Sequence, residues 1–190
     1  MIYDLNVLRK ARRKSKKSKK TMSAQYTPVG IGEKVYDELV NIVRRSYKDA
    51  CILYIDKVSN PTLEFAFEKR CKTFAQGGAN IQRLFHGTRA EYVNSICTNG
   101  YDSKFNKRAA FGPGTYFSTA GAYSKDYTDI NEGGESFLIV NKVALGYFTF
   151  STGAKYDGDS GGDGKNIFVI RHDDAALPEY VICFHKNAKA

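Results

Sequence analysis

The stretch Leu84-Phe85-His86-Gly87-Thr88 is a short apolar run that ends in a histidine and a glycine. Short apolar runs bounded by turn residues are typical of β-strands, and further runs of this kind follow at close intervals. The predicted strands are residues 83–86, 115–118, 136–145, 166–171 and 179–185. Two short helices are predicted among them, at 89–98 and 120–127. Strands this dense favour an α+β domain built on antiparallel sheet over a doubly wound parallel one.

Upstream of this stretch the pattern predicts helix, strand and helix. A helical stripe of apolar residues begins after Gly32, and residues 51–58 form a short branched run typical of a strand. Asn60 and Pro61 predict a helix start, because Asn accepts hydrogen bonds from free amides and Pro fits the first helical position. We expect that helix to continue through Phe74 to the glycines at 77–78. The glycine-rich segment 151–165 is predicted to be a mobile surface loop.

The net charge of +9 over 190 residues is concentrated at the N-terminus. Residues 1–20 hold nine Lys and Arg against one Asp. We therefore predict a basic disordered tail over residues 1–24 and a folded domain over 25–190. The basic run resembles a nuclear-localisation or polyanion-binding segment, so a nucleic acid or a nuclear import receptor is a candidate partner of residues 9–20. This favours the nucleus, with the cytoplasm as the alternative.

Four widely spaced cysteines, Cys51, Cys71, Cys97 and Cys183, lack a Cys-x-x-Cys pair and a His at ligand spacing. We expect no bound metal, and reduced thiols in an intracellular compartment. The chain has no apolar run of the roughly 18 to 20 residues that a membrane helix needs, so we expect no membrane association.

Several common nucleotide and hydrolase motifs are excluded. Gly112-Pro113-Gly114 is followed by Thr115, where a dinucleotide-binding loop would continue to another glycine and open a helix. The chain contains no Gly-Lys-Ser/Thr ending, and no nucleophile elbow of a hydrolase is expected, although Gly158-Asp159-Ser160-Gly161-Gly162 has the Gly-x-Ser-x-Gly spacing. Neither a Rossmann site nor a nucleoside triphosphate loop is therefore expected.

A set of short segments, taken in chain order, carries a family resemblance. They are Leu84-Phe85-His86-Gly87-Thr88, Gly114-Thr115-Tyr116-Phe117-Ser118, Tyr123-Ser124-Lys125-Asp126-Tyr127 and Val143-Ala144-Leu145-Gly146. Over residues 30–187 the chain resembles the catalytic domain of the poly(ADP-ribose) polymerase family. The ending 166–182 is similar to that of its mono-ADP-ribosylating members. The resemblance implies split antiparallel sheets, with flanking short helices, around a crevice that holds NAD+.

The resemblance also implies roles for named residues. His86 would hold the nicotinamide ribose, Gly87 would present its backbone to the carboxamide, and Tyr127 would stack on the nicotinamide ring. Thr88 would contact the same dinucleotide, although it could instead cap the following helix. Tyr116 would offer a second aromatic surface. Two further binding residues are implied, Phe117 at the pocket floor and Ser124 as a donor to the carboxamide.

The third catalytic position, after His86 and Tyr116, falls on Ile167. Polymerising relatives carry Glu there to activate the hydroxyl that extends a chain, and Ile has no oxygen with which to do so. The resemblance thus implies an NAD+-dependent mono-ADP-ribosyltransferase that modifies a protein side chain, itself included, and releases nicotinamide. A single compact catalytic domain suggests a monomer. The alternative is a module that binds NAD+ or ADP-ribose without transfer. In the loop 102–111, which departs from the family pattern, Lys104, Lys107 and Arg108 would either meet the pyrophosphate or remain ordinary surface charges.

Overall fold

The computed structural model describes residues 23–74, 78–106, 110–119 and 133–186. The strands it describes form one antiparallel sheet of eight, in the order β1-β2-β8-β5-β3-β4-β7-β6. The predicted α+β class is confirmed. The strands are β1 (Gln25–Pro28), β2 (Cys51–Ser59), β3 (Ile81–Thr88), β4 (Thr115–Ser118), β5 (Glu135–Ala144), β6 (Ser160–Gly162), β7 (Ile167–Ile170) and β8 (Ala176–His185). The helices are α2 (Lys34–Ser46), α3 (Pro61–Cys71) and α4 (Ala90–Asn99), with short 3-10 turns η2 (Ser103–Phe105) and η4 (Asp173–Ala175).

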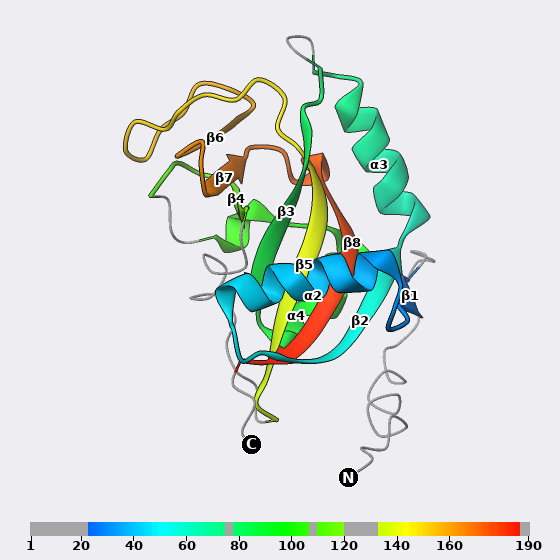
Figure 1. Cartoon of the computed structure of the whole chain (residues 1–190). Helices are drawn as coiled ribbons and strands as arrows, with labels where there is room; N and C mark the ends of the chain where they lie inside the picture. Colours follow the sequence, from blue (N-terminus) through cyan, green and yellow to red (C-terminus); the bar gives the residue numbers. More distant parts are fainter. Residues whose placement is uncertain (1–22, 75–77, 107–109, 120–132, 187–190) are drawn as a thin grey trace.

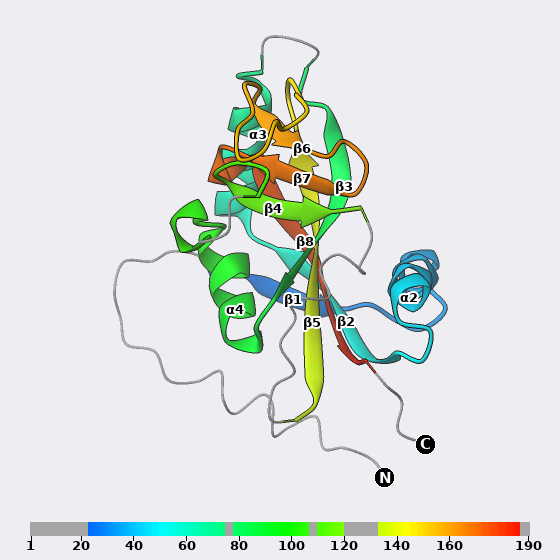
Figure 2. The same ribbon diagram turned by 90° about the vertical axis from the view of Figure 1, so that its left-hand side faces the viewer.

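The sheet changes direction where β3 meets β4. β3 pairs with β5 along its whole length, from Ile81 to Thr88. With β4 it shares a single registered pair, Phe85 with Ser118. Figure 2 shows β4, β7 and β6 running across the long strands. The split expected from the family resemblance is therefore a sharp turn within one hydrogen-bonded sheet.

The helices cover opposite faces of the long strands. In Figures 1 and 2, α2 lies on one face and α4 on the other. Along β3, Phe85 packs with the apolar residues of α2, whereas Leu84 joins a cluster that includes Phe67 of α3. Because successive side chains of a strand point to opposite faces, His86 lies on the face of Leu84, away from α2.

The predicted start of α3 is confirmed at Asn60. Its side-chain oxygen accepts hydrogen bonds from the backbone amides of Thr62 at 3.1 Å and Leu63 at 3.3 Å, and Pro61 occupies the first helical position. Its amide nitrogen donates to the carbonyl oxygens of Cys97 at 3.0 Å and Thr98 at 2.9 Å. Asn60 thus joins the start of α3 to the end of α4, which stops as predicted at Gly100, in a left-handed conformation.

Two sequence-based predictions about element bounds are wrong. Helix α3 ends at Cys71, so Phe74 lies beyond it. There the hydroxyl of Thr73 donates to the carbonyl oxygen of Arg70 at 2.7 Å, a local bond that competes with continued helix. Segment 151–165 is not wholly a surface loop, because it contains β6, and Ser160 in that strand is fully buried.

Two predictions concern residues that the structure does not describe, and one observed strand was not predicted. The predicted helix at 120–127 and the basic tail up to residue 22 lie outside them. Strand β1 was not predicted, because four residues are too short to display a clear alternation. No helix within the described ranges combines the length and apolarity of a membrane span.

Candidate active site

His86 lies near the end of β3, beside the junction with β4. Its Nδ1 atom is 2.8 Å from the backbone carbonyl oxygen of Tyr116. A carbonyl oxygen only accepts hydrogen bonds, so Nδ1 carries the proton and donates it. In the neutral ring the other nitrogen, Nε2, then bears a lone pair. The bond to the Tyr116 carbonyl therefore leaves Nε2 as the ring atom of His86 that can accept a hydrogen bond.

Burial keeps the His86 ring neutral. It lowers the pKa of His86 below the ordinary value of about 6.5, although the bond to the Tyr116 carbonyl opposes this change. At neutral pH the imidazole is therefore uncharged, and Nε2 can accept a hydrogen bond from a hydroxyl group.

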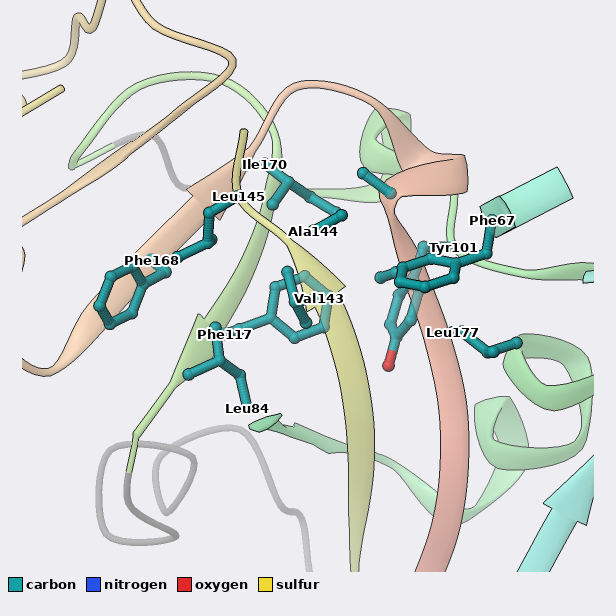
Figure 3. Packing of buried hydrophobic residues seen from close by; sticks show 12 residues of the cluster. Phe67, Leu84, Tyr101, Phe117, Val143, Ala144, Leu145, Phe168, Ile170 and Leu177 are labelled. Atoms are coloured by element: carbon teal, nitrogen blue, oxygen red, sulfur yellow. The ribbon is translucent and has the colours of Figure 1, made fainter. Parts of the chain in front are cut away.

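Two aromatic rings pack against His86. Tyr101 meets it edge to face, with ring centroids 5.0 Å apart, and Phe117 lies at 5.7 Å. Tyr101 and Phe117 also touch each other at 5.2 Å. Figure 3 shows both rings inside a buried cluster with Leu84 and Val143. Phe117 is buried, with an exposed fraction of 2%, and its expected place at the pocket floor stays a prediction.

The hydroxyl of Tyr101 reaches a second buried polar residue. It donates a hydrogen bond of 2.7 Å to Oδ1 of Asn141 on β5. The amide nitrogen of Asn141 donates to the carbonyl oxygens of Ile139 at 3.0 Å and Leu84 at 3.4 Å. Burial raises the pKa of Tyr101 well above its ordinary value, so the hydroxyl remains a donor.

Tyr116 is tied by its hydroxyl to the loop before β4. The hydroxyl donates to the carbonyl oxygen of Gly112 at 2.6 Å and accepts from the amide of Phe111 at 3.0 Å. Two residues of the glycine-rich segment fasten the same loop. Ser151 donates to the carbonyl of Phe111 at 2.8 Å, and Tyr156 donates to the carbonyl of Pro113 at 2.7 Å. The segment predicted to be mobile thus helps to position Tyr116.

Ile167 begins β7 and pairs with Ser118. By strand alternation it shares a face of β4 and β7 with Tyr116, opposite Phe117. Its amide is one of three that donate to Oδ1 of Asp163, at 2.8 Å, together with those of Lys165 and Asn166. Burial raises the pKa of Asp163, but these donors outweigh it and leave the pKa below its ordinary value. An ionised Asp163 therefore fixes the hairpin that presents Ile167.

Asp173 ties the loop after α4 to β4. Its Oδ1 atom accepts from the amide of Ser103 and from the hydroxyl of Thr115, each at 3.0 Å, and Oδ2 accepts from the Ser103 hydroxyl at 3.2 Å. Asn106 adds a bond of 2.8 Å to the carbonyl of Gly114. These contacts hold η2, where Lys104 is exposed, against the start of β4.

The structure places most of the predicted site residues on adjacent strands but not on one face, because His86 packs against Phe117, whereas Tyr116 and Ile167 lie on the opposite face of β4 and β7. His86, Gly87 and Thr88 end β3, Tyr116 and Phe117 lie on β4, and Ile167 starts β7, so three adjacent strands carry them. Thr88 does not occupy the cap position of α4, which belongs to Arg89. The remaining predicted residues, Ser124, Tyr127, Lys107 and Arg108, lie outside the described residues.

The nearby acidic residues are engaged away from Ile167. Glu179 contacts Lys142 at 3.1 Å and Arg83 at 3.5 Å, on the face covered by α2. Asp174 forms two hydrogen bonds with Arg70 of α3, at 2.7 and 3.1 Å. Within the ranges that the structure describes, no group of three or more His, Cys, Asp or Glu is placed to hold a metal ion.

Sequence reasoning did not find Tyr101 or Asn141, nor the anchoring role of Asp173. The bond between Tyr101 and Asn141 joins residues 40 apart, and that between Ser103 and Asp173 joins residues 70 apart. Contacts at such separations leave no local pattern from which they could be found.

Comparison with known proteins gives a family and several relatives. The family described as "Poly(ADP-ribose) polymerase catalytic domain" matches residues 33–162, a range that contains His86 and Tyr116 and ends before Ile167. Protein mono-ADP-ribosyltransferase PARP11 of Homo sapiens is 28% identical over 190 residues, covering 79% of this chain and 56% of the relative. PARP14 of Homo sapiens, another protein mono-ADP-ribosyltransferase, is 27% identical, covering 79% of this chain and 10% of the relative.

A third relative is also named a protein mono-ADP-ribosyltransferase. Protein mono-ADP-ribosyltransferase PARP10 of Mus musculus is 30% identical over 152 residues, covering 69% of this chain and 16% of the relative. The chain therefore spans about half the length of PARP11 and a smaller share of PARP14 and PARP10.

Proposed function

This chain belongs to the family of poly(ADP-ribose) polymerase catalytic domains, and on that premise we propose that it is an NAD+-dependent mono-ADP-ribosyltransferase. In the proposed reaction the bond between C1′ of the ribose and the nicotinamide nitrogen breaks. A bond from C1′ to a side-chain atom of an acceptor protein forms. Nicotinamide leaves as a neutral molecule, and any proton on the acceptor atom passes to solvent.

The bond between His86 and the Tyr116 carbonyl carries this proposal. It fixes a neutral imidazole whose Nε2 accepts hydrogen bonds. A hydroxyl of the nicotinamide ribose is a suitable donor for that atom. A ribose held in this way keeps C1′ in place while positive charge develops on it, and such positioning can contribute several kcal/mol to catalysis.

The hydrocarbon side chain of Ile167 supports single transfer. Extension of a polymer requires activation of a ribose hydroxyl by a hydrogen-bond acceptor, and Ile has no atom that can accept. The described acidic neighbours Asp174 and Glu179 are paired with Arg70 and Lys142. The relatives are named protein mono-ADP-ribosyltransferases, and this favours the same outcome and a protein acceptor.

The direct test incubates the chain with NAD+ labelled in its adenylate part and follows both protein labelling and nicotinamide release. We expect discrete labelled bands, which the His86→Gln variant loses. His185→Gln is the matched control, because Nδ1 of His185 also bonds a carbonyl oxygen, that of Gly134 at 2.9 Å, on a different strand. This control should label as the wild type does.

Three results would contradict parts of the proposal. A chain that binds NAD+ without releasing nicotinamide would be a binding module, the alternative function. Long polymer would refute the role given to Ile167. Equal labelling by wild type and His86→Gln would remove His86 from the site.

The basic residues 9–20 support a second, separate proposal. Nine cationic side chains against one Asp in the first 20 residues form a segment suited to a polyanion or an import receptor. A fluorescent fusion should accumulate in the nucleus and lose this accumulation when residues 1–22 are deleted, while NAD+-dependent labelling is retained. Unchanged distribution after the deletion would refute the nuclear assignment.

A further inference from the structure

Asn141 is a buried amide in the middle of the core strand β5. It is fully enclosed, and a buried amide is costly unless its donors and acceptor are satisfied. Its nitrogen faces the carbonyl oxygens of Ile139 and Leu84, which can only accept, so the side-chain orientation is determined. Its oxygen is then directed to the hydroxyl of Tyr101.

The sheet is irregular beside Asn141. On β8 the register moves from Tyr180 opposite Val140 to Pro178 opposite Asn141, so Glu179 is an extra, bulged residue. Pro178 has no N–H to donate to the ladder. Bulges often occur next to functional sites, where they redirect side chains. Asn141 thus lies at the one place in the β5–β8 pairing where the regular ladder is interrupted.

Tyr101 connects this position to His86. Its ring lies edge to face on the imidazole at 5.0 Å and on Phe117 at 5.2 Å, while its hydroxyl is held by Asn141 at 2.7 Å. The imidazole is therefore fixed at two points. One is the bond from Nδ1 to Tyr116, and the other is the anchored ring of Tyr101.

We propose that Asn141 is a positioning residue for His86, acting through the hydrogen-bonded ring of Tyr101. The anchored ring sets the plane of the imidazole and so the direction in which Nε2 accepts. The catalytic consequence rests on the function proposed above, whereas the effect on the His86 ring does not. An apolar pair at positions 101 and 141, such as Phe and Leu, would fill the same core but would have no hydrogen bond to fix the rotation of the ring at position 101.

The first test observes the ring directly in the full chain. Imidazole ¹⁵N–¹H spectra, with His86 assigned by His86→Gln, should show one tautomer in the wild type, protonated at Nδ1. Tyr101→Phe should produce a mixture of tautomers for His86, because an imidazole that turns out of its plane loses the bond from Nδ1 to the Tyr116 carbonyl. Tyr54→Phe is the control, because Tyr54 loses a hydroxyl bonded to Cys183 rather than to the site, and it should leave the His86 signals unchanged.

A double variant separates positioning from stability. Tyr101→Phe leaves the Asn141 oxygen buried without its donor, so it should lower Tm. Tyr101→Phe combined with Asn141→Leu removes the hydroxyl and its acceptor together and should recover part of that loss. The recovery is limited because the carbonyl oxygens of Ile139 and Leu84 also lose the Asn141 amide. We expect the His86 tautomers to remain mixed in the double variant. A wild-type His86 spectrum in the stable double variant would overturn the proposal.

The kinetic test uses the same variants with NAD+. We expect kcat to fall about tenfold in both Tyr101→Phe and the double variant, with a smaller change in KM, because a misdirected acceptor affects orientation more than binding. If the wild type transfers nothing, the proposed function fails, and the tautomer result still decides the positioning role. If the wild type is active and the double variant retains its kcat, the positioning role fails and the function stands.

Discussion

The Nδ1 atom of His86 donates a hydrogen bond of 2.8 Å to the backbone carbonyl oxygen of Tyr116, and this bond joins the two directions of the sheet. It lies beside Phe85 and Ser118, the single registered pair between β3 and β4 among the described residues. The bond that orients the imidazole therefore also strengthens the pairing between β3 and β4, which share one registered pair among the described residues. Changes at His86 should affect both stability and transfer.

Acid should weaken the fold through His86. Because the folded pKa of His86 lies below about 6.5, the unfolded chain takes up the proton first as the pH falls. The stability contributed by neutral His86 is complete above pH 6.5 and is lost as the pH falls toward the folded pKa. The free energy of unfolding, measured with urea at pH 7.5 and at pH 5.5, should fall more between these two pH values in the wild type than in His86→Gln. Equal losses would contradict this assignment, and His185→Gln should keep the wild-type difference.

Transfer should decline over the same acidic range. In the proposed reaction, Nε2 of His86 accepts a hydrogen bond from the ribose hydroxyl, and protonation of Nε2 would remove the lone pair that does so. We expect kcat/KM for NAD+ to fall once the pH drops below the value at which His86 becomes protonated in the folded chain. Imidazole NMR measures that pH independently. A rate that stays constant through the observed His86 titration would exclude Nε2 as the acceptor.

Gly114 should not tolerate a side chain. Its φ is +145°, and an added Cβ would lie 2.2 Å from the carbonyl oxygen of Ile170, a backbone atom of the paired strand. We expect Gly114→Ala to destabilise the chain by about 2 to 4 kcal/mol. Gly153→Ala is the matched control, with φ +61° and open space around it, and should cost about 1 kcal/mol. If thermal denaturation showed the same loss of stability in Gly114→Ala and Gly153→Ala, β4 and β7 would be able to move apart at this point without an energetic cost.

Asp173 should affect NAD+ binding more than Asp174 does. Asp173→Ala removes three hydrogen bonds that hold Ser103 and Thr115 together, each contributing about 1 kcal/mol. We expect KM for NAD+ to rise roughly tenfold as η2 is released from β4. Asp174→Ala removes a carboxylate from the same turn but breaks only the pair with Arg70, so its KM should stay within about twofold. A similar KM in both variants would show that η2 does not contribute to the NAD+ site.

The cysteines should differ sharply in reactivity. Burial raises the pKa of both Cys97 and Cys183 to about 12, whereas Cys51 is exposed. Only the thiolate is alkylated, so iodoacetamide at pH 8 should modify Cys51 in the native chain and leave Cys97 and Cys183 unmodified until denaturant is added. Peptide mass analysis of the alkylated sites measures this, and rapid native labelling of Cys97 would contradict the packing of α4 on the sheet.

Much of the fold could be predicted because it rests on local patterns. Short apolar runs identified the strands that carry His86, Tyr116 and Ile167, and the Asn60-Pro61 pair located the start of α3. The same reasoning failed for Phe74 and for β6. A local hydroxyl bond ended α3 early, and three residues of a glycine-rich segment became strand only through pairing with β7.

By itself, the sequence determined the α+β class and the positions of the histidine and tyrosine on neighbouring elements, because side-chain period and capping residues act within a few positions of the chain. Only the tertiary structure decided how these residues are held. The Tyr116 carbonyl sets the proton of His86, Asn141 anchors Tyr101 beside it, and Asp173 joins Ser103 to Thr115. Each of these bonds spans 30 residues or more. A buried polar side chain is stable only when its partner is in place, and folding alone brings such distant partners together.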